Sequence, residues 1–248
     1  MVSVMKDKDR EGSFGIRQLD NIKLGSIKKG DFGLIHGPSG TGKTSFSLHF
    51  LFEGSSNGEN VCIITNGSKS RLLERISTFS TFDPKWLKEG YLFIFRIQDM
   101  MSLVGLDFNN PGEGDYSLFY KLLIDTLDNM DIKRFILDPL SPILRWVEKG
   151  GRKSFLSELK VDLQNRDVMG FMVLDDDGMY GISGNQLVEP NIFDVVIRFE
   201  KEYEKATSLN TLRIQRWNSS VHSRNTYAVD ITEEGVILVP RIKSSEVK

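Results

Sequence analysis

One segment, His36-Gly37-Pro38-Ser39-Gly40-Thr41-Gly42-Lys43-Thr44, fills every fixed position of the phosphate-binding loop pattern GxxxxGK(S/T). In such a loop the glycines let several backbone N–H groups converge on one point, where they bind phosphate oxygens. Lys43 adds a positive charge for the terminal phosphates, and the Thr44 hydroxyl can bind Mg²⁺. The segment therefore predicts a site for ATP and Mg²⁺, with Pro38 to Thr44 as the residues that bind the nucleotide.

The flanks of the loop agree with this prediction. Upstream, Asp31-Phe32-Gly33-Leu34-Ile35 is a short apolar run that predicts a buried strand ending at the loop. Downstream, Thr44 to Glu53 is apolar nearly all round, as a helix in the centre of a fold would be, and Gly54 is predicted to be its C-cap. The alternative is a glycine-rich turn that matches by chance, and the strand and helix on either side argue against it.

Length and composition indicate one domain of ordinary charge. The chain has 248 residues, and its 32 Lys and Arg nearly balance its 34 Asp and Glu, so no basic excess indicates a nucleic-acid surface. The only cysteine, Cys62, is expected to be a small buried side chain, which excludes a disulfide within the chain. Met1 to Ser13 lacks the apolar core of a signal peptide, and no run approaches the roughly 18 apolar residues that span a bilayer. We therefore expect a cytoplasmic protein.

Strands and helices are predicted to alternate along the chain. We expect a mobile tail over 1–13, one domain over 14–241 and a C-terminal tail over 242–248. After the loop, the alternation predicts an α/β fold of three layers, with a mainly parallel central sheet. The expected strands are Val61–Thr65, Tyr91–Phe95, Arg134–Asp138 and Val168–Leu174. The expected helices are Ser70–Ser77, one that starts at Asp115, and Ser154–Gln164, with a loop over Met100–Gly114 and a turn over Pro139–Pro142.

Asp138 ends the apolar strand that starts at Arg134, and we expect this strand to lie next to the one that precedes the loop. A carboxylate at the end of such a strand orders the Mg²⁺ shell in phosphate-loop proteins. The alternative is a strand-end aspartate that caps the following turn, and the loop upstream favours the metal role. Thr44 and Asp138 are therefore the predicted Mg²⁺ ligands.

Three adjacent carboxylates, Asp175, Asp176 and Asp177, follow the strand Val168–Leu174. They could help to hold a metal ion, but a charge run that enters a glycine turn is more often a solvated strand end. We assign them no role from the sequence.

The pattern changes after Ile192. Short runs of alternating apolar and polar residues, separated by charged or Asn/Ser-rich turns, predict an antiparallel extension of the sheet. The expected strands are Ile192–Phe199, Leu209–Trp217, Thr226–Ile231 and Gly235–Pro240.

Taken together, these segments resemble a single KaiC-type domain of the RecA superfamily. Gly15-Ile16 with Leu19-Asp20 is similar to the GIPGLD-like segment with which that family begins, and Gly37 to Thr44 is similar to its Walker A loop. The segments Ile136 to Ser141 and Val188 to Ile197 are similar to its Walker B strand and its VEE…ADGVI segment. The resemblance covers nearly the whole chain and implies an ATP-binding protein.

The resemblance also implies residues that reach the nucleotide of a neighbouring subunit. Arg216 to His222 and Thr232-Glu233 lie where the family has a KMRGxxH segment and a TD pair. On this basis Arg216, Asn218, His222 and Glu233 are predicted nucleotide-binding residues, Arg216 should lie at the rim and away from its own Lys43, and the chain should form a homo-oligomer, a hexameric ring by resemblance.

Two departures from the family pattern bear on hydrolysis. Where the family has paired glutamates after its second strand, one of which activates the attacking water, this chain has Asn66-Gly67-Ser68. In the basic segment, Asn218 and Ser219 replace the family's arginine and glycine. Loss of a water-positioning group or of an arginine finger lowers the hydrolysis rate by orders of magnitude, whereas phosphate binding by the loop backbone is unaffected.

Three functions are compatible with these residues. The favoured one is a nucleotide-dependent switch or scaffold, which meets a protein partner in signal transduction and hydrolyses ATP slowly or not at all. The second is an active ATPase whose general base is Glu74 or one of Asp175 to Asp177. The third is a RecA-like DNA-binding recombinase paralogue, against which the balanced charge and the lack of an Arg/Lys-rich loop with aromatic residues argue.

Overall fold

A nine-stranded mixed sheet runs through the residues that the computed structural model describes, which are 11–21, 26–110, 112, 115–147, 151–176, 188–204, 207–218 and 222–241. Its strand order is β11-β10-β9-β8-β3-β7-β6-β4-β5. The strands are β3 (Phe32–Gly37), β4 (Asn60–Thr65), β5 (Leu92–Arg96), β6 (Ile132–Asp138), β7 (Met169–Asp175), β8 (Val195–Glu204), β9 (Thr207–Trp217), β10 (Thr226–Thr232) and β11 (Gly235–Pro240). A small separate sheet pairs β1 (Glu11–Gly12) with β2 (Ile27–Lys28).

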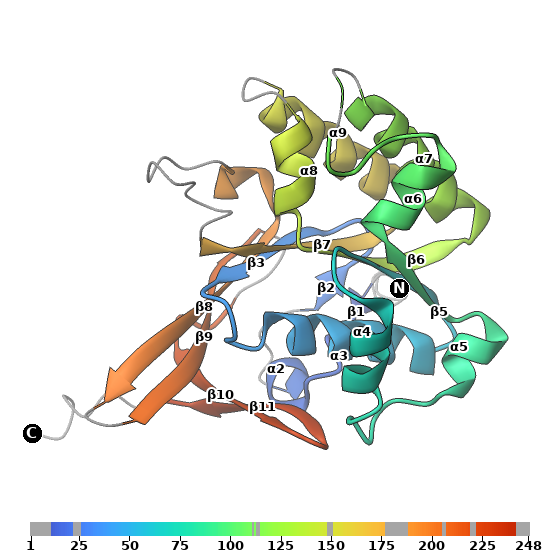
Figure 1. Cartoon of the computed structure of the whole chain (residues 1–248). Helices are drawn as coiled ribbons and strands as arrows, with labels where there is room; N and C mark the ends of the chain where they lie inside the picture. The colour runs from blue at the N-terminus through green and yellow to red at the C-terminus, as the bar shows by residue number, and fades with distance from the viewer. Residues whose placement is uncertain are drawn as a thin grey trace, which may run out of the picture.

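Helices cover both faces of the central sheet, as Figure 1 shows. One face carries α2 (Arg17–Asn21), α3 (Lys43–Ser56), α4 (Lys69–Ile76) and α5 (Lys85–Glu89). The other carries α6 (Ile97–Leu103), α7 (Asp115–Asn129), α8 (Ser141–Trp146) and α9 (Arg152–Asn165). The buried apolar side chains accordingly form two clusters, one on each side of the sheet. The predicted three-layer α/β fold is confirmed, and within the described ranges no helix is both long and apolar enough to cross a bilayer.

The order of the strands differs from the sequence prediction. The strand that ends in Asp138, β6, does not lie next to β3, because β7 pairs in parallel with both and separates them. β8 is also not purely antiparallel, since it pairs in parallel with β3 on one side and antiparallel with β9 on the other. Which strands become neighbours depends on the paths of the connections through space, which local periodicity does not encode.

Several element boundaries also differ from those expected. The segment expected to be a loop from Met100 begins inside α6, the turn after Asp138 continues into α8, and β8 starts only at Val195, after the 3₁₀ turn η1 (Pro190–Ile192). Glu11–Gly12 forms β1, so the fold includes residues that were assigned to the mobile tail. The ranges 1–10 and 242–248, which hold the rest of the two predicted tails, lie outside the described residues.

The helix after the loop, α3, is buried on nearly all sides, as its composition predicts. It does not end at Gly54, because it continues to Ser56 with Asn57 as its C-cap. A Cβ atom at position 54 would lie 2.7 Å from the Arg134 side chain, so this glycine is explained by close packing within the helix.

Arg134 joins α3 to the sheet beneath it. Its guanidinium is almost fully buried and donates 2.5 Å to Glu59, 2.6 Å to the carbonyl of Ser13 and 3.0 Å to the carbonyl of Phe50. It also lies 4.9 Å from the centre of the Phe50 ring. A buried charge needs partners of this kind, because an unpaired one would be strongly destabilising.

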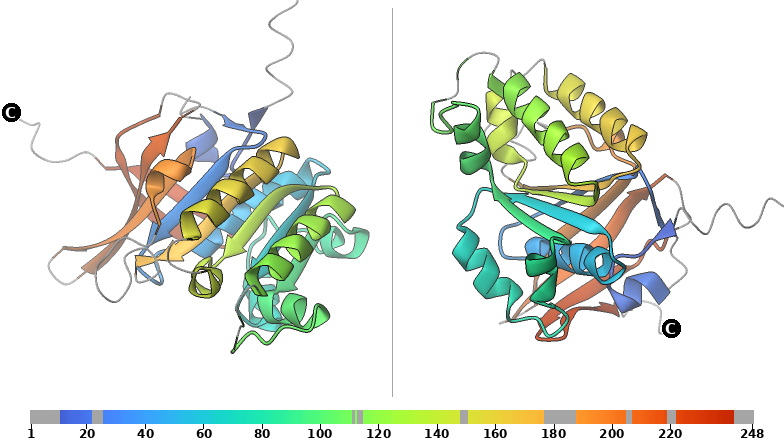
Figure 2. Two further views of the ribbon diagram at one scale, coloured as in Figure 1. Left: turned by 90° about the horizontal axis from the view of Figure 1, so that it is seen from above. Right: turned by 90° about the vertical axis from the view of Figure 1, so that its right-hand side faces the viewer.

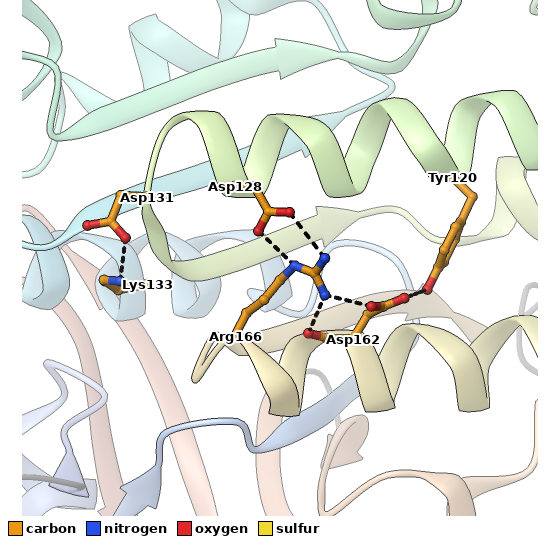
Figure 3. Close-up of polar contacts among 6 residues, drawn as sticks. All are labelled: Tyr120, Asp128, Asp131, Lys133, Asp162 and Arg166. Atoms are coloured by element: carbon orange, nitrogen blue, oxygen red, sulfur yellow. Dashed lines mark hydrogen bonds and ion pairs between the residues drawn. The ribbon is translucent and has the colours of Figure 1, made fainter.

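On the opposite face, α7 and α9 lie side by side (Figure 2, right). Arg166, which follows α9, donates to both carboxylate oxygens of Asp128 on α7 and to Asp162 on α9 (Figure 3). Tyr120 on α7 donates its hydroxyl proton to the same Asp162, and burial is the main cause that raises its pKa. These contacts join the two helices at a distance from the loop.

His49 lies on the face of α3 that the β10–β11 hairpin covers. It contacts the rings of Phe52 and Phe79, and a Cβ atom on Gly235 would lie 2.4 Å from its ring, so only glycine fits there without displacement. Burial lowers the pKa of His49 to about 4. The folded protein therefore holds a neutral imidazole at pH values at which the unfolded chain binds a proton.

We predict that this histidine makes the fold sensitive to acid. A group with a lowered pKa contributes stability that is present above its unfolded pKa of about 6.5 and is lost as the pH falls towards 4, by up to about 3 kcal/mol. Chemical denaturation of the wild type and of His49→Gln between pH 7 and pH 4 measures this effect. The free energy of unfolding should fall less steeply in the variant, since all carboxylates and His36 titrate in both proteins; equal slopes would contradict the prediction.

Candidate functional site

The glycine-rich loop connects the carboxyl end of β3 to the first residue of α3. Gly37 has φ 145°, and a Cβ atom there would lie 2.2 Å from the Phe199 carbonyl oxygen of β8. Any residue other than glycine would clash with β8 at this position. Gly42 precedes α3 in the left-handed conformation and offers no side chain to cap it. No N-cap side chain therefore accepts from the first N–H groups of α3. Free N–H groups at the start of a helix favour the binding of an anion.

Lys43 is the first residue of α3, and its almost fully buried side chain lies against the loop. Its ammonium group donates 2.7 Å to the carbonyl of Gly37 and 2.7 Å to the carbonyl of Pro38. It also lies 2.7 Å from Oδ1 of Asp175, at the end of β7. Three oxygen atoms thus surround an ammonium group that has three protons to donate.

Asp138 reaches the loop from β6. The Thr44 hydroxyl donates 2.6 Å to its Oδ2, so the two predicted Mg²⁺ ligands are in contact even though their strands are not neighbours. Burial raises the pKa of Asp138, the Thr44 hydrogen bond and the Lys43 charge act to lower it, and the charge of Asp175 raises it further. Two oxygen ligands side by side suit a hard cation such as Mg²⁺.

One carboxylate, that of Asp175 at the end of β7, is brought to Lys43, which the sequence did not indicate. β7 pairs with β3 so that Asp175 is opposite Gly37, and this register carries its side chain to Lys43. Asp176 points elsewhere, with Oδ1 4.0 Å from Nδ1 of His36, while Asp177 lies outside the described residues. Asp175 is thus a half-exposed strand end that also contacts Lys43, a contact that the sequence did not indicate because the adjacency of β7 and β3 was not foreseen.

His36 occupies a buried position on β3 just before the loop. Its Nε2 lies 3.0 Å from the side-chain oxygen of Gln215 on β9, and burial lowers its pKa. The contact links the loop strand to the C-terminal strands.

The end of β4 carries amides and a hydroxyl where the resemblance implies carboxylates. Thr65 pairs with Asp138, so Asn66 follows directly beside the predicted metal ligand. The amide nitrogen of Gln98 on α6 donates 2.5 Å to the side-chain oxygen of Asn66, and Ser68 caps α4 by accepting from the Arg71 N–H. Gln98 gave no signal in the sequence, because it lies between the strand expected over Tyr91–Phe95 and the loop expected from Met100, in a stretch with no predicted element.

A cavity of about 380 Å³ opens beside the first turn of α3. It is lined by Ser45, Arg75, Thr78, Phe79, Ile231, Thr232 and Glu233. Arg75 donates 3.0 Å to the Ser45 hydroxyl, and the carbonyl of Glu233 accepts from Ser80. Glu233 therefore lies next to its own α3, whereas the resemblance implied a reach to a neighbouring subunit.

Arg216 and Asn218 lie towards the other end of the strands. Arg216 pairs with Val196, which pairs with Leu34, so it lies two strands from β3 and about 10 Å along the strand direction from Gly37. Its guanidinium donates 2.7 Å to Asn218, whose backbone N–H donates to the Asp194 carbonyl. This register places Arg216 apart from its own Lys43, as expected.

His222 is half-buried in the segment between β9 and β10. Residues 219–221, which connect it to Asn218, lie outside the described residues. Of the predicted site residues, the structure thus brings Thr44, Lys43, Asp138 and Glu233 to one region and keeps Arg216 and Asn218 apart from it.

Comparisons with known proteins point to one family. A family model described as "ATPase: KaiC" matches residues 12–243. The circadian clock oscillator protein KaiC of Nostoc sp. is 26% identical over 230 residues, which cover 91% of this chain but 43% of the relative. A UPF0273 protein of Pyrococcus furiosus is 24% identical over 236 residues, covering 91% of this chain and 92% of that protein. The chain thus spans about half the length of the clock proteins that it matches.

A solved structure has the same fold. The crystal structure of a KaiC-like protein from the hyperthermophilic archaeon Pyrococcus horikoshii superposes with a TM-score of 0.75 at 22% identity. The match covers 93% of this chain and 99% of that one.

Proposed function

The chain belongs to the KaiC family of ATPases, and we propose that it is a nucleotide-dependent switch or scaffold that binds ATP with Mg²⁺ and hydrolyses it slowly or not at all. The observation that carries the slow hydrolysis is the Asn66–Gln98 amide pair at the end of β4, next to Asp138. An amide can orient a water molecule but cannot take its proton, so this position lacks a general base.

The residues of the loop fit the phosphates of a nucleotide. In the proposed complex, the backbone N–H groups of Ser39 to Thr44 and the Lys43 ammonium bind phosphate oxygens, and the oxygens of Thr44 and Asp138 hold the metal ion. Mg²⁺ would supply positive charge that neutralises the phosphates. The contact of 2.6 Å between Thr44 and Asp138 supports this assignment, since it places two oxygen ligands within reach of one cation.

We assign the nucleoside to the cavity beside α3. It adjoins the first turn of the helix through Ser45, and it combines the Phe79 ring with the hydroxyl of Thr78 and the charged side chains of Arg75 and Glu233. An aromatic wall with a few polar groups suits a base and a ribose. Under this assignment Glu233 binds the nucleotide of its own subunit.

A second candidate is an active ATPase of the same fold. The specific observation in its favour is Asp175, whose carboxylate is close to the loop. Its contact with Lys43 argues against a role as general base, since it directs the carboxylate to the ammonium group and away from a water molecule. Glu74, on the exposed side of α4, is the other candidate named from the sequence.

MgATP should stabilise the fold by linkage. At a free concentration one hundred times the dissociation constant, the gain is about 2.7 kcal/mol. Thermal unfolding with and without MgATP should show this shift in the wild type and in Lys69→Ala, an exposed lysine of α4, and little of it in Lys43→Ala. Equal shifts in all three proteins would place the nucleotide elsewhere.

Phosphate release should be slow, and a carboxylate at position 66 should raise it. We expect a turnover below about one per minute, because weakly catalysed phosphate-loop sites are slower than that. Asn66→Glu should raise it at least tenfold, since a positioned general base contributes about 10²–10⁴-fold. A wild-type turnover well above one per minute that is lost in Lys43→Ala would support the active ATPase instead.

Assembly should depend on nucleotide and on Arg216. We propose that Arg216, Asn218 and His222 face the nucleotide of a neighbouring subunit, so that a ligand bound between subunits favours a ring, six-membered by family resemblance, through mass action. Light scattering with Mg²⁺ and a non-hydrolysable ATP analogue should detect the ring, and smaller species without nucleotide. Arg216→Ala should weaken the ring and leave nucleotide binding by single subunits largely intact. If Arg216→Ala assembles like the wild type, Arg216 does not act between subunits.

A further inference from the structure

We propose that the carboxylate of Asp175 competes with a bound nucleotide for the Lys43 ammonium group. Its negative charge repels the terminal phosphate of the nucleotide and so sets the relative affinities for ATP and ADP. This inference rests on the proposed function, since it assumes that the loop binds nucleotide. From the sequence alone, Asp175 had no assigned role.

Each of the three protons on the Lys43 ammonium group has an acceptor in the structure. Lys43 has three protons to donate, and its three acceptors in the structure are the carbonyls of Gly37 and Pro38 and the carboxylate of Asp175, each at 2.7 Å. A phosphate oxygen that binds Lys43 must therefore replace or share one of these acceptors.

The second step identifies the acceptor that yields. The two carbonyls belong to the backbone of a loop that is held between β8 and α3, and the close approach of Gly37 to Phe199 leaves it little room to move. The Asp175 side chain is 49% exposed, so water can solvate its carboxylate once it leaves Lys43. The Lys43 side chain is only 7% exposed and needs an acceptor in its place, which the phosphate provides.

The third step is electrostatic. Asp175 pairs in register with Gly37 on the neighbouring strand, so even a rotated carboxylate stays close to the loop. Two negative groups that face one ammonium repel each other, and the repulsion grows with the charge of the ligand. ATP carries one more phosphate than ADP, and the lysine of a phosphate-binding loop reaches this γ-phosphate as well as the β-phosphate. The cost should therefore be larger for ATP.

Asp138 lies in the same region as Asp175, because it accepts from Thr44, the residue that follows Lys43. Burial is the main cause that raises the pKa of Asp138, and the charge of Asp175 adds to it. The two carboxylates thus lie near the same residues of the loop, and their strands, β6 and β7, are neighbours on one side of β3.

Asp175→Asn tests the inference, with Asp176→Asn as the matched control. The asparagine keeps the shape and an oxygen acceptor for Lys43 but removes the charge. The control removes the same charge one residue along the chain, where the carboxylate faces His36. The measurement is the dissociation constant of the full chain for ADP and for a non-hydrolysable ATP analogue, both with Mg²⁺, by titration calorimetry.

We expect Asp175→Asn to bind the ATP analogue roughly tenfold more tightly than the wild type and ADP with a smaller gain, while Asp176→Asn changes both constants less than threefold. Asp175→Ser serves as a second variant if the asparagine protein does not fold. Unchanged or weaker binding by a folded Asp175 variant overturns the inference, and weaker binding would assign Asp175 to the metal ion instead. If the wild type binds neither nucleotide, the proposed function fails first, so the two failures are distinguishable.

Discussion

The parallel pairing of β7 with β3 decides which charges surround the loop. In a parallel pair both carboxyl ends lie at the same edge of the sheet, and the register places Asp175 opposite Gly37, the residue at which β3 becomes the loop. β6 and β4 end at the same edge, with Asp138 opposite Thr65. β3, β7, β6 and β4 therefore deliver their last residues to one edge of the sheet, whatever their separation in the chain.

Packing beneath the loop holds the site in place. Gly37 passes the backbone of β8 at a distance that allows no side chain, and Gly33, earlier in the same strand, lies against the Phe171 ring of β7. On the helix side, Gly54 lets α3 approach Arg134, whose hydrogen bonds tie the helix to β6 and to Ser13. Contacts of this kind leave few alternative positions for a loop that must present several N–H groups to one anion.

Under the proposed function, the site would combine strong binding of phosphate with weak activation of water. The loop and Thr44 have the chemistry of a family of ATPases, whereas the position next to Asp138 carries Asn66, held by Gln98. Such a site would favour bound nucleotide over hydrolysis, as the proposed switch or scaffold requires. The contact of His36 with Gln215 joins the loop strand to the C-terminal strands that carry Arg216, so a route of direct contacts runs between the two regions.

The sequence by itself determined the local features of this protein. The loop pattern, the buried helix after it, the α/β class and the roles expected of Lys43, Thr44 and Asp138 follow from residue type and short-range periodicity, which sterics and burial impose within a few residues. The resemblance of motifs along the chain indicated the family. Only the tertiary structure decided that β7 separates β3 from β6, that Asp175 contacts Lys43, that Gln98 holds Asn66, and that Glu233 lies beside its own α3. These facts depend on which strands become neighbours, and strand order arises from packing between segments far apart in the chain, on which a local pattern carries no information.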